Sequence, residues 1–168
     1  IPPQVADGLR DALDAHQLIV LRGQHLDLAA QKRLTEVFGP LMRLPYVKPM
    51  VEDPDVIAVL KEATEKGGGV FGGDWHSDFS FLDNPPAGSV LNAVEVPDVG
   101  GDTVWSSQVA AYAHLPADLK RIVDGRAAVH VGAPYGVKHA PPEDARSGAS
   151  IQMTRGDPAA DRETLHPA

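Results

Sequence analysis

Two side chains that could bind a metal ion stand two residues apart in this sequence, at His76 and Asp78. Side chains of a strand alternate between its two faces, so residues at this spacing project from the same face and can meet one ion. Two histidines and one carboxylate on one face of Fe(II) form the facial triad of non-haem iron enzymes. The pair therefore offers two of three such ligands. The spacing alone is a weak signal, because His-x-Asp also arises by chance or as a hydrogen-bonded pair.

The surrounding motifs carry more information than the spacing does. The run at residues 75–78 reads WHSD, residues 85–88 read PPAG, and residues 100–105 read GGDTVW. In this order and register they resemble the taurine dioxygenase family of Fe(II)- and 2-oxoglutarate-dependent oxygenases, which includes the dichlorophenoxyacetate dioxygenases. The likeness covers most of the chain, since it also includes residues 38–41, 110–112, 115–116 and 128–130.

The resemblance implies an enzyme and names its site residues. His76 and Asp78 would be metal ligands, and Thr103 would offer its hydroxyl to a carboxylate of 2-oxoglutarate. Fe(II), 2-oxoglutarate and O₂ would then support hydroxylation of a small organic anion, with release of succinate and CO₂. The alternatives are a catalytically silent protein of the same fold and a cupin-type binding protein that holds another metal.

The third metal ligand is the difficulty, because the family's second His and an Arg that pairs with 2-oxoglutarate lie farther downstream than this chain extends. Within the chain, His130 and His139 could supply a ligand on spacing alone, but neither matches the family's ligand position. We therefore expect the C-terminal half of the site, with the distal His and Arg, to be absent from this chain. We also expect the 168-residue chain alone to be inactive.

The substrate is expected to be more apolar than taurine. Where taurine-binding members carry a His and an Asn, this chain reads Leu44 and Gly72, and missing hydrogen bonds would leave the charges of a small zwitterion unpaired. The residues expected to contact substrate are Tyr46, Val47, Trp75 and Phe81. An alkyl sulfate, a sulfonate or an aryloxy acid fits this pocket better.

Local patterns predict the elements that must position these residues. Helices are expected at residues 3–16, from an N-cap at Asp27 to residue 38, from an N-cap at Ser107 to residue 112, and with Pro116 in the first turn of another. Strands are expected at residues 18–21, 55–60, 87–96, 103–105 and 127–131, and through the metal motif. A flexible loop is expected at residues 65–74, and a mobile segment beyond residue 132.

These elements predict a mainly β fold with flanking helices, as an antiparallel jelly roll. The resemblance makes it a double-stranded β-helix, incomplete in this chain. Residues 1–168 would form a single domain, the N-terminal and central part of a 2-oxoglutarate-dependent dioxygenase.

The composition of the chain limits the classes of partner that it is expected to bind. The formal charge of -8 argues against nucleic-acid binding, which needs clustered Lys and Arg. The chain contains 0 cysteines, so a metal must be held by His and carboxylates. No apolar run approaches the length of a membrane span. We expect a small anionic substrate as partner, with no nucleic acid and no membrane, in a cytoplasmic homo-oligomer.

Overall fold

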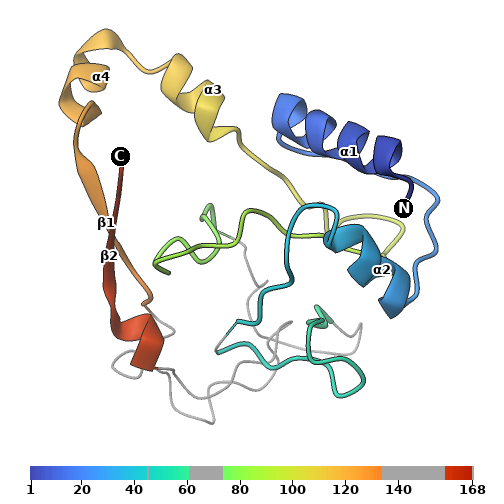
Figure 1. Ribbon diagram of the computed structural model, residues 1–168. Coiled ribbons are helices and arrows are strands. Elements are labelled where there is room, and N and C mark those ends of the chain that lie inside the picture. Colours follow the sequence, from blue (N-terminus) through green and yellow to red (C-terminus); the bar gives the residue numbers. More distant parts are fainter. Residues whose placement is uncertain (45, 61–73, 134–157, 168) are drawn as a thin grey trace. The chain divides into compact units, whose positions relative to one another are not determined.

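The computed structural model describes residues 1–44, 46–60, 74–133 and 158–167 (Figure 1). Contacts between these residues divide the chain into two units. The first comprises Ile1–Leu41 and Ala87–Arg126, and the second comprises Met42–Pro86 and Ala127–Pro167. Each unit is described by itself, and the prediction of a single domain stays a prediction. His139, most of the loop expected at residues 65–74, and residues 134–157 of the segment expected to be mobile lie outside the described residues.

Helix α1, Pro3–His16, confirms the helix expected at residues 3–16. A proline is favoured at the first helical positions, where its missing N–H costs nothing. The helix ends because Gln17 adopts a left-handed conformation with φ of 63°, and its N–H donates to the carbonyl of Leu13 at 2.6 Å. Arg10 then ties α1 to the chain beyond the next helix, since its Nε donates to the carbonyl of Val37 at 2.7 Å.

Helix α2, Leu28–Thr35, begins at the expected N-cap. The Asp27 carboxylate accepts the N–H of Ala30 at 2.7 Å, which satisfies one of the free donors of the first turn. The helix ends earlier than expected, because residues 37 and 38 bond three residues back and not four, as in a tighter closing turn. The prediction that it reaches residue 38 was therefore wrong by three residues.

Two short helices follow in the first unit. Helix α3, Gln108–Ala113, has the expected N-cap, and the Ser107 hydroxyl accepts the N–H of Ala110 at 3.1 Å. Helix α4, Ala117–Val123, begins directly after Pro116, which is the N-cap and not a residue of the first turn as expected. The fixed φ of proline still suits this entry into a helix.

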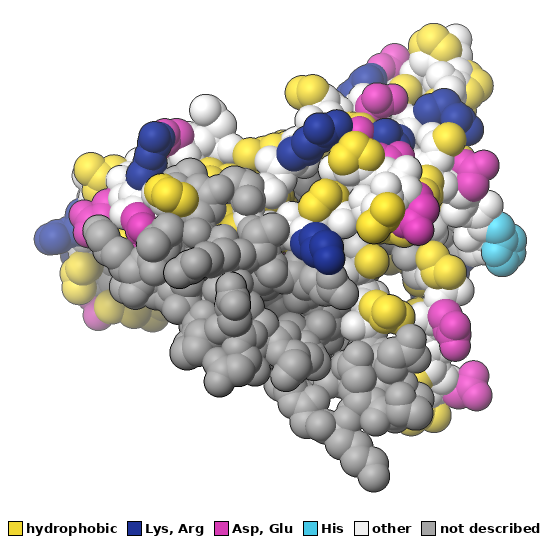
Figure 2. Space-filling model, turned by 90° about the horizontal axis from the view of Figure 1, so that it is seen from below, with side chains coloured by type: hydrophobic (Ala, Val, Ile, Leu, Met, Phe, Trp, Pro, Cys, Tyr) yellow, Lys and Arg dark blue, Asp and Glu magenta, His cyan; other side chains and the backbone are white. Residues whose placement is uncertain are grey.

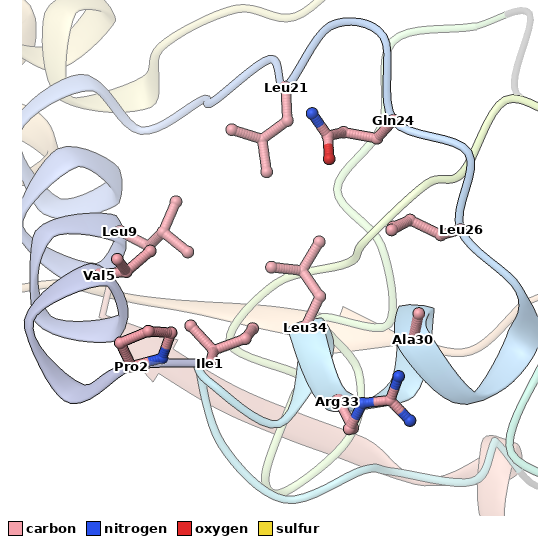
Figure 3. A pocket seen from close by; sticks show the side chains of 10 residues that line it. All are labelled: Ile1, Pro2, Val5, Leu9, Leu21, Gln24, Leu26, Ala30, Arg33 and Leu34. Atoms are coloured by element: carbon pink, nitrogen blue, oxygen red, sulfur yellow. The ribbon is translucent and has the colours of Figure 1, made fainter.

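Apolar side chains of α1, α2 and residues 21–26 surround a hollow of about 430 Å³ in the first unit. Figure 3 shows Leu9, Leu21 and Leu34 pointing into it from these three segments. The spacing of Val5 and Leu9 on α1 places both on the side of the helix that faces the hollow.

The strand expected at residues 127–131 is confirmed as β1, Ala127–Val131. It pairs antiparallel with β2, Glu163–Pro167, with Val129 opposite Leu165 (Figure 1). A short 3₁₀ helix, Pro158–Asp161, leads into β2. Among the described residues these two strands form one sheet, and the antiparallel pairing agrees with the expected arrangement.

The other expected strands are corrected by the structure. Residues 18–21, 56–60, 88–93 and 103–105 form no strand, and Pro54 and Asp55 lie in a turn. The reason is pairing, because a strand exists only where a neighbour accepts its ladder hydrogen bonds. Residues 90 and 92 instead contact side chains and carbonyls of the α2 region, through Gln31 Nε2 to the carbonyl of Val90 and Asn92 Nδ2 to the carbonyl of Leu26. The alternation of apolar and polar residues indicated where a strand could form, but it could not show whether a neighbouring strand is present to pair with it.

The surface of the described residues mixes charge and apolar groups. On the face seen in Figure 2, Lys and Arg side chains are interspersed with Asp, Glu and hydrophobic side chains. None of the helices within the described ranges is both long enough and apolar enough to span a membrane.

Candidate functional site

The metal motif lies in the second unit at the start of a tight turn. Residues 75–77 have no regular secondary structure, and residues 78–81 turn. Phe79 has a φ of 52°, which is uncommon for a residue with a side chain, and the N–H of Leu82 donates to the Phe79 carbonyl at 3.0 Å. The strand expected through the metal motif is therefore not formed at residues 75–81. Phe81 also lies an odd number of positions after His76 and Asp78, so alternation along a strand would have placed it on the opposite face from them.

The structure brings His76 and Asp78 together. His76 Nε2 lies 3.1 Å from Asp78 Oδ1, and the two side chains are 48% and 55% exposed. The other ring nitrogen, Nδ1, lies 2.7 Å from the carbonyl oxygen of Asp74 and donates its proton there. Nε2 is therefore the nitrogen that faces the carboxylate.

The same contacts change the acidity of the imidazole. The hydrogen bond to the Asp74 carbonyl raises the pKa of His76, and the carboxylates of Asp78 and, to a smaller extent, Asp74 raise it further. Partial burial of the ring opposes this increase. Both oxygens favour a ring that carries a proton on each nitrogen. A cation that binds Nε2 takes the place of the proton shared with Asp78.

The pair fits two adjacent ligands of one cation. Adjacent ligand atoms at about 2.1 Å from an octahedral ion lie about 3 Å apart, close to the observed Nε2 to Oδ1 distance. Histidines that bind metals commonly donate the other ring N–H to a carbonyl or a carboxylate, as His76 does to Asp74. Half-exposed side chains also leave the pair accessible to an ion.

A third ligand is not found among the described residues, where no group of three or more His, Asp or Glu side chains could hold a metal. His130 lies on β1, and its ring packs edge-on against His166 of β2 with centroids 5.1 Å apart. His130 therefore has a neighbour of its own within the sheet.

Three of the four residues expected to contact substrate form the core of the second unit. Tyr46, Val47 and Phe81 are 1%, 6% and 6% exposed. The Tyr46 ring lies 5.8 Å from the rings of both Phe79 and Phe81, centroid to centroid. Trp75 is instead 72% exposed, beside the metal motif in sequence. The structure thus separates one surface aromatic from three packed side chains, and contact of any of them with substrate stays a prediction.

Thr103 lies in the first unit and is exposed. It is therefore accessible to a ligand. Its predicted contact with 2-oxoglutarate stays a prediction.

The sequence reasoning missed three side chains of the chain segment that enters and forms β2. Thr164 Oγ1 donates to the carbonyl of Phe81 at 2.7 Å, His166 Nε2 lies 3.3 Å from the carbonyl of Leu82, and Arg162 pairs with Asp83 at 3.2 Å. The polar side chains at residues 162, 164 and 166 were visible in the sequence. They did not indicate a partner some 80 positions earlier in the chain.

Comparison with known proteins agrees with the motifs. The model of the family described as "Taurine catabolism dioxygenase TauD, TfdA family" matches residues 1–167. The chain is 36% identical over 123 residues to an alkylsulfatase of Acinetobacter baylyi, covering 73% of this chain and 37% of that protein. It is 35% identical over 125 residues to an alpha-ketoglutarate-dependent sulfate ester dioxygenase of Pseudomonas putida, covering 74% of this chain and 40% of that protein.

A third relative is the alpha-ketoglutarate-dependent 2,4-dichlorophenoxyacetate dioxygenase of Cupriavidus pinatubonensis, 33% identical over 132 residues, which cover 70% of this chain and 46% of that protein. In the first two relatives the match spans about two fifths of their length.

Proposed function

Because the chain belongs to the TauD, TfdA family, we propose that it is part of an Fe(II)- and 2-oxoglutarate-dependent dioxygenase that hydroxylates a small organic anion. The observation that carries the proposal is the His76 and Asp78 pair, whose Nε2 and Oδ1 atoms lie 3.1 Å apart. Fe(II) with 2-oxoglutarate and O₂ supplies the oxidising chemistry when bound, and succinate and CO₂ are the co-products.

The residues of this chain have separate tasks in the proposed site. His76 and Asp78 hold the cation, while the Asp74 carbonyl fixes the imidazole so that Nε2 faces the carboxylate. Thr103 donates its hydroxyl to a carboxylate of 2-oxoglutarate. A third ligand and an Arg for the co-substrate are further parts of the proposed site, and among the described residues no group of three ligands is complete.

The proposed substrate class is an amphipathic anion, with an alkyl sulfate first. Relatives described as an alkylsulfatase, a sulfate ester dioxygenase and a dichlorophenoxyacetate dioxygenase support this class. Leu44, which is partly buried against the core, offers no hydrogen bond where taurine-binding members carry a His. The exposed Trp75 beside the pair provides apolar surface for an alkyl or aryl group. Hydroxylation of the carbon next to a sulfate ester gives a hemiacetal that collapses to an aldehyde and sulfate.

The metal assignment can be tested in a protein of the relatives' full length. We expect His76→Ala and Asp78→Ala each to abolish the weak visible band that Fe(II) and 2-oxoglutarate give together without O₂, and to abolish succinate formation. Ser77→Ala is the matched control, since this exposed side chain lies between the two ligands and should leave both signals intact. Loss of neither signal in the two ligand variants would refute the assignment.

The same experiment separates the alternatives. A catalytically silent protein of this fold would give no band with Fe(II) and 2-oxoglutarate, and a cupin-type protein for another metal would bind that metal without forming succinate. A substrate screen in which taurine is consumed faster than alkyl sulfates would contradict the proposed substrate class. The small-anion partner is part of this proposal. The absence of nucleic-acid and membrane partners, cytoplasmic location and homo-oligomeric state stay predictions.

A further inference from the structure

Three side chains of the segment that forms β2 hold three consecutive residues that follow the metal motif. The Thr164 hydroxyl donates to the carbonyl of Phe81 at 2.7 Å, His166 Nε2 lies 3.3 Å from the carbonyl of Leu82, and Arg162 pairs with Asp83 at 3.2 Å. Residues 162, 164 and 166 alternate along the chain, so they share one side of the strand and its entry. We call these contacts the β2 clamp.

The clamp is built around one buried polar residue. Thr164 is 8% exposed, and its hydroxyl also lies 3.4 Å from Asp83 Oδ1. By contrast, Leu165 between the clamp residues is 67% exposed. A buried hydroxyl needs a partner, and the Phe81 carbonyl needs one too, because residues 81–83 belong to no described strand. The Thr164 hydroxyl thus gives the Phe81 carbonyl the hydrogen bond that a neighbouring strand would otherwise supply.

The clamped residues are directly joined to the metal-binding turn. The turn begins at Asp78 and is closed by the hydrogen bond from the Leu82 N–H to the Phe79 carbonyl at 3.0 Å. The Phe81 carbonyl is held by Thr164, and the Phe81 ring is held by Tyr46 and Val47 in the core. Phe81 is therefore fixed at both its backbone and its side chain, three positions after Asp78.

Asp78 needs such an anchor. Its side chain is 55% exposed, and the structure places His76 Nε2 beside it. A half-exposed carboxylate with one such neighbour is positioned mainly by its backbone. His166 is in turn supported from β1, since the His130 ring packs edge-on against it at 5.1 Å.

We propose that Thr164, with Arg162 and His166, positions Asp78 for metal binding by fixing the end of the turn at Phe81 and Leu82. This inference rests on the proposed function, because it takes the His76 and Asp78 pair to be the metal site. Thr164 touches neither the cation nor the substrate, so it is a positioning residue. Residues that orient a ligand from behind commonly change metal affinity about 10- to 100-fold when they are substituted.

The test uses Thr164→Val, which keeps the shape and removes the hydroxyl, and Thr164→Ser, which restores it. The matched control is Thr35→Val on α2 in the other unit, where the hydroxyl donates to the carbonyl of Gln31 at 2.9 Å. Two readouts are taken on a protein of the relatives' full length. One is Co(II) affinity with its visible spectrum, and the other is the hydrogen-exchange rate of the Leu82 amide without metal.

We expect Thr164→Val to weaken Co(II) binding about 10-fold, to alter the Co(II) spectrum, and to speed exchange at Leu82. Thr164→Ser should return all three signals toward wild type, and Thr35→Val should change none of them. A Thr164→Val protein with wild-type affinity and spectrum would overturn the positioning role. Equal losses in Thr164→Val and Thr35→Val would also overturn it, since general destabilisation would then explain both.

A second variant decides the case in which Thr164→Val does not fold. Arg162→Gln removes the ion pair with Asp83 from a side chain that is 68% exposed, so folding should survive. A smaller loss of Co(II) affinity with faster exchange at Leu82 supports the clamp, and wild-type values of both overturn it. Wild-type protein that binds no Co(II) would instead refute the metal assignment itself, and the positioning role would fall with it.

Discussion

Replacing Phe81 by Ala tests whether this residue is part of the core or a contact for substrate. Its side chain is 6% exposed and packs against Tyr46, with ring centroids 5.8 Å apart. A buried aromatic side chain removes about 150–250 Å² from water. At about 25 cal/mol per Å² this contributes about 4–6 kcal/mol. Ala keeps only the first carbon, so we expect the free energy of unfolding to fall by about 3–5 kcal/mol.

The measurement is urea unfolding followed by circular dichroism, with two companion variants. Phe81→Leu keeps much of the volume and should cost about 1 kcal/mol. Val51→Ala, in the same unit at a side chain that is 92% exposed, should change the free energy by less than about 0.5 kcal/mol. In a protein of full length, Phe81→Leu should leave KM for an alkyl sulfate unchanged. A large rise in KM with stability unaffected would contradict the core role and support the predicted contact of Phe81 with substrate.

Three further predictions concern the first unit. Asp27→Ala should lower the free energy of unfolding by about 1 kcal/mol, because the carboxylate caps α2 at 2.7 Å, and Asp27→Asn should recover most of it in the same urea titration. Gly101→Ala should destabilise by at least about 1 kcal/mol, since its φ is +74°, while Gly88→Ala, which has open space around it, should not. The hydrogen bond to Asp124 raises the pKa of the Tyr112 hydroxyl. The stability lost in Tyr112→Phe should therefore be constant below about pH 10 and disappear as the pH rises through the raised pKa, which urea midpoints from pH 8 to 11 can measure.

The helices of the first unit were predictable because their signals are local. The helix expected at residues 3–16 and the N-caps at Asp27 and Ser107 depend on contacts within three or four residues, and the structure confirms all three. The ends were harder, as the early stop of α2 shows, because closing turns depend on small differences between bonding three and four residues back. Strands were harder still. Residues 18–21 have a strand-like composition but no ladder partner among the described residues, and pairing is a property of two segments.

In the candidate site too, local contacts were predictable from the sequence and long-range contacts were not. Two-residue spacing correctly indicated that His76 and Asp78 could meet, since one position separates them along the chain. It failed at the next residue, because nothing in the alternation shows that Phe79 adopts a positive φ. The contact between Thr164 and Phe81 joins residues 83 positions apart, so no local pattern could have paired them.

The short-range and long-range contacts have different roles in the proposed site. The short-range contacts of residues 74–78 determine which atoms face a cation, because the Asp74 carbonyl selects Nε2 of His76. The long-range contact with Thr164 determines where the Asp78 backbone lies. Loss of the first kind removes a ligand and should abolish binding, whereas loss of the second leaves both ligands present in a looser geometry. A graded loss of affinity in the Thr164 variants, against complete loss in the His76 and Asp78 variants, is therefore the pattern that distinguishes positioning from ligation.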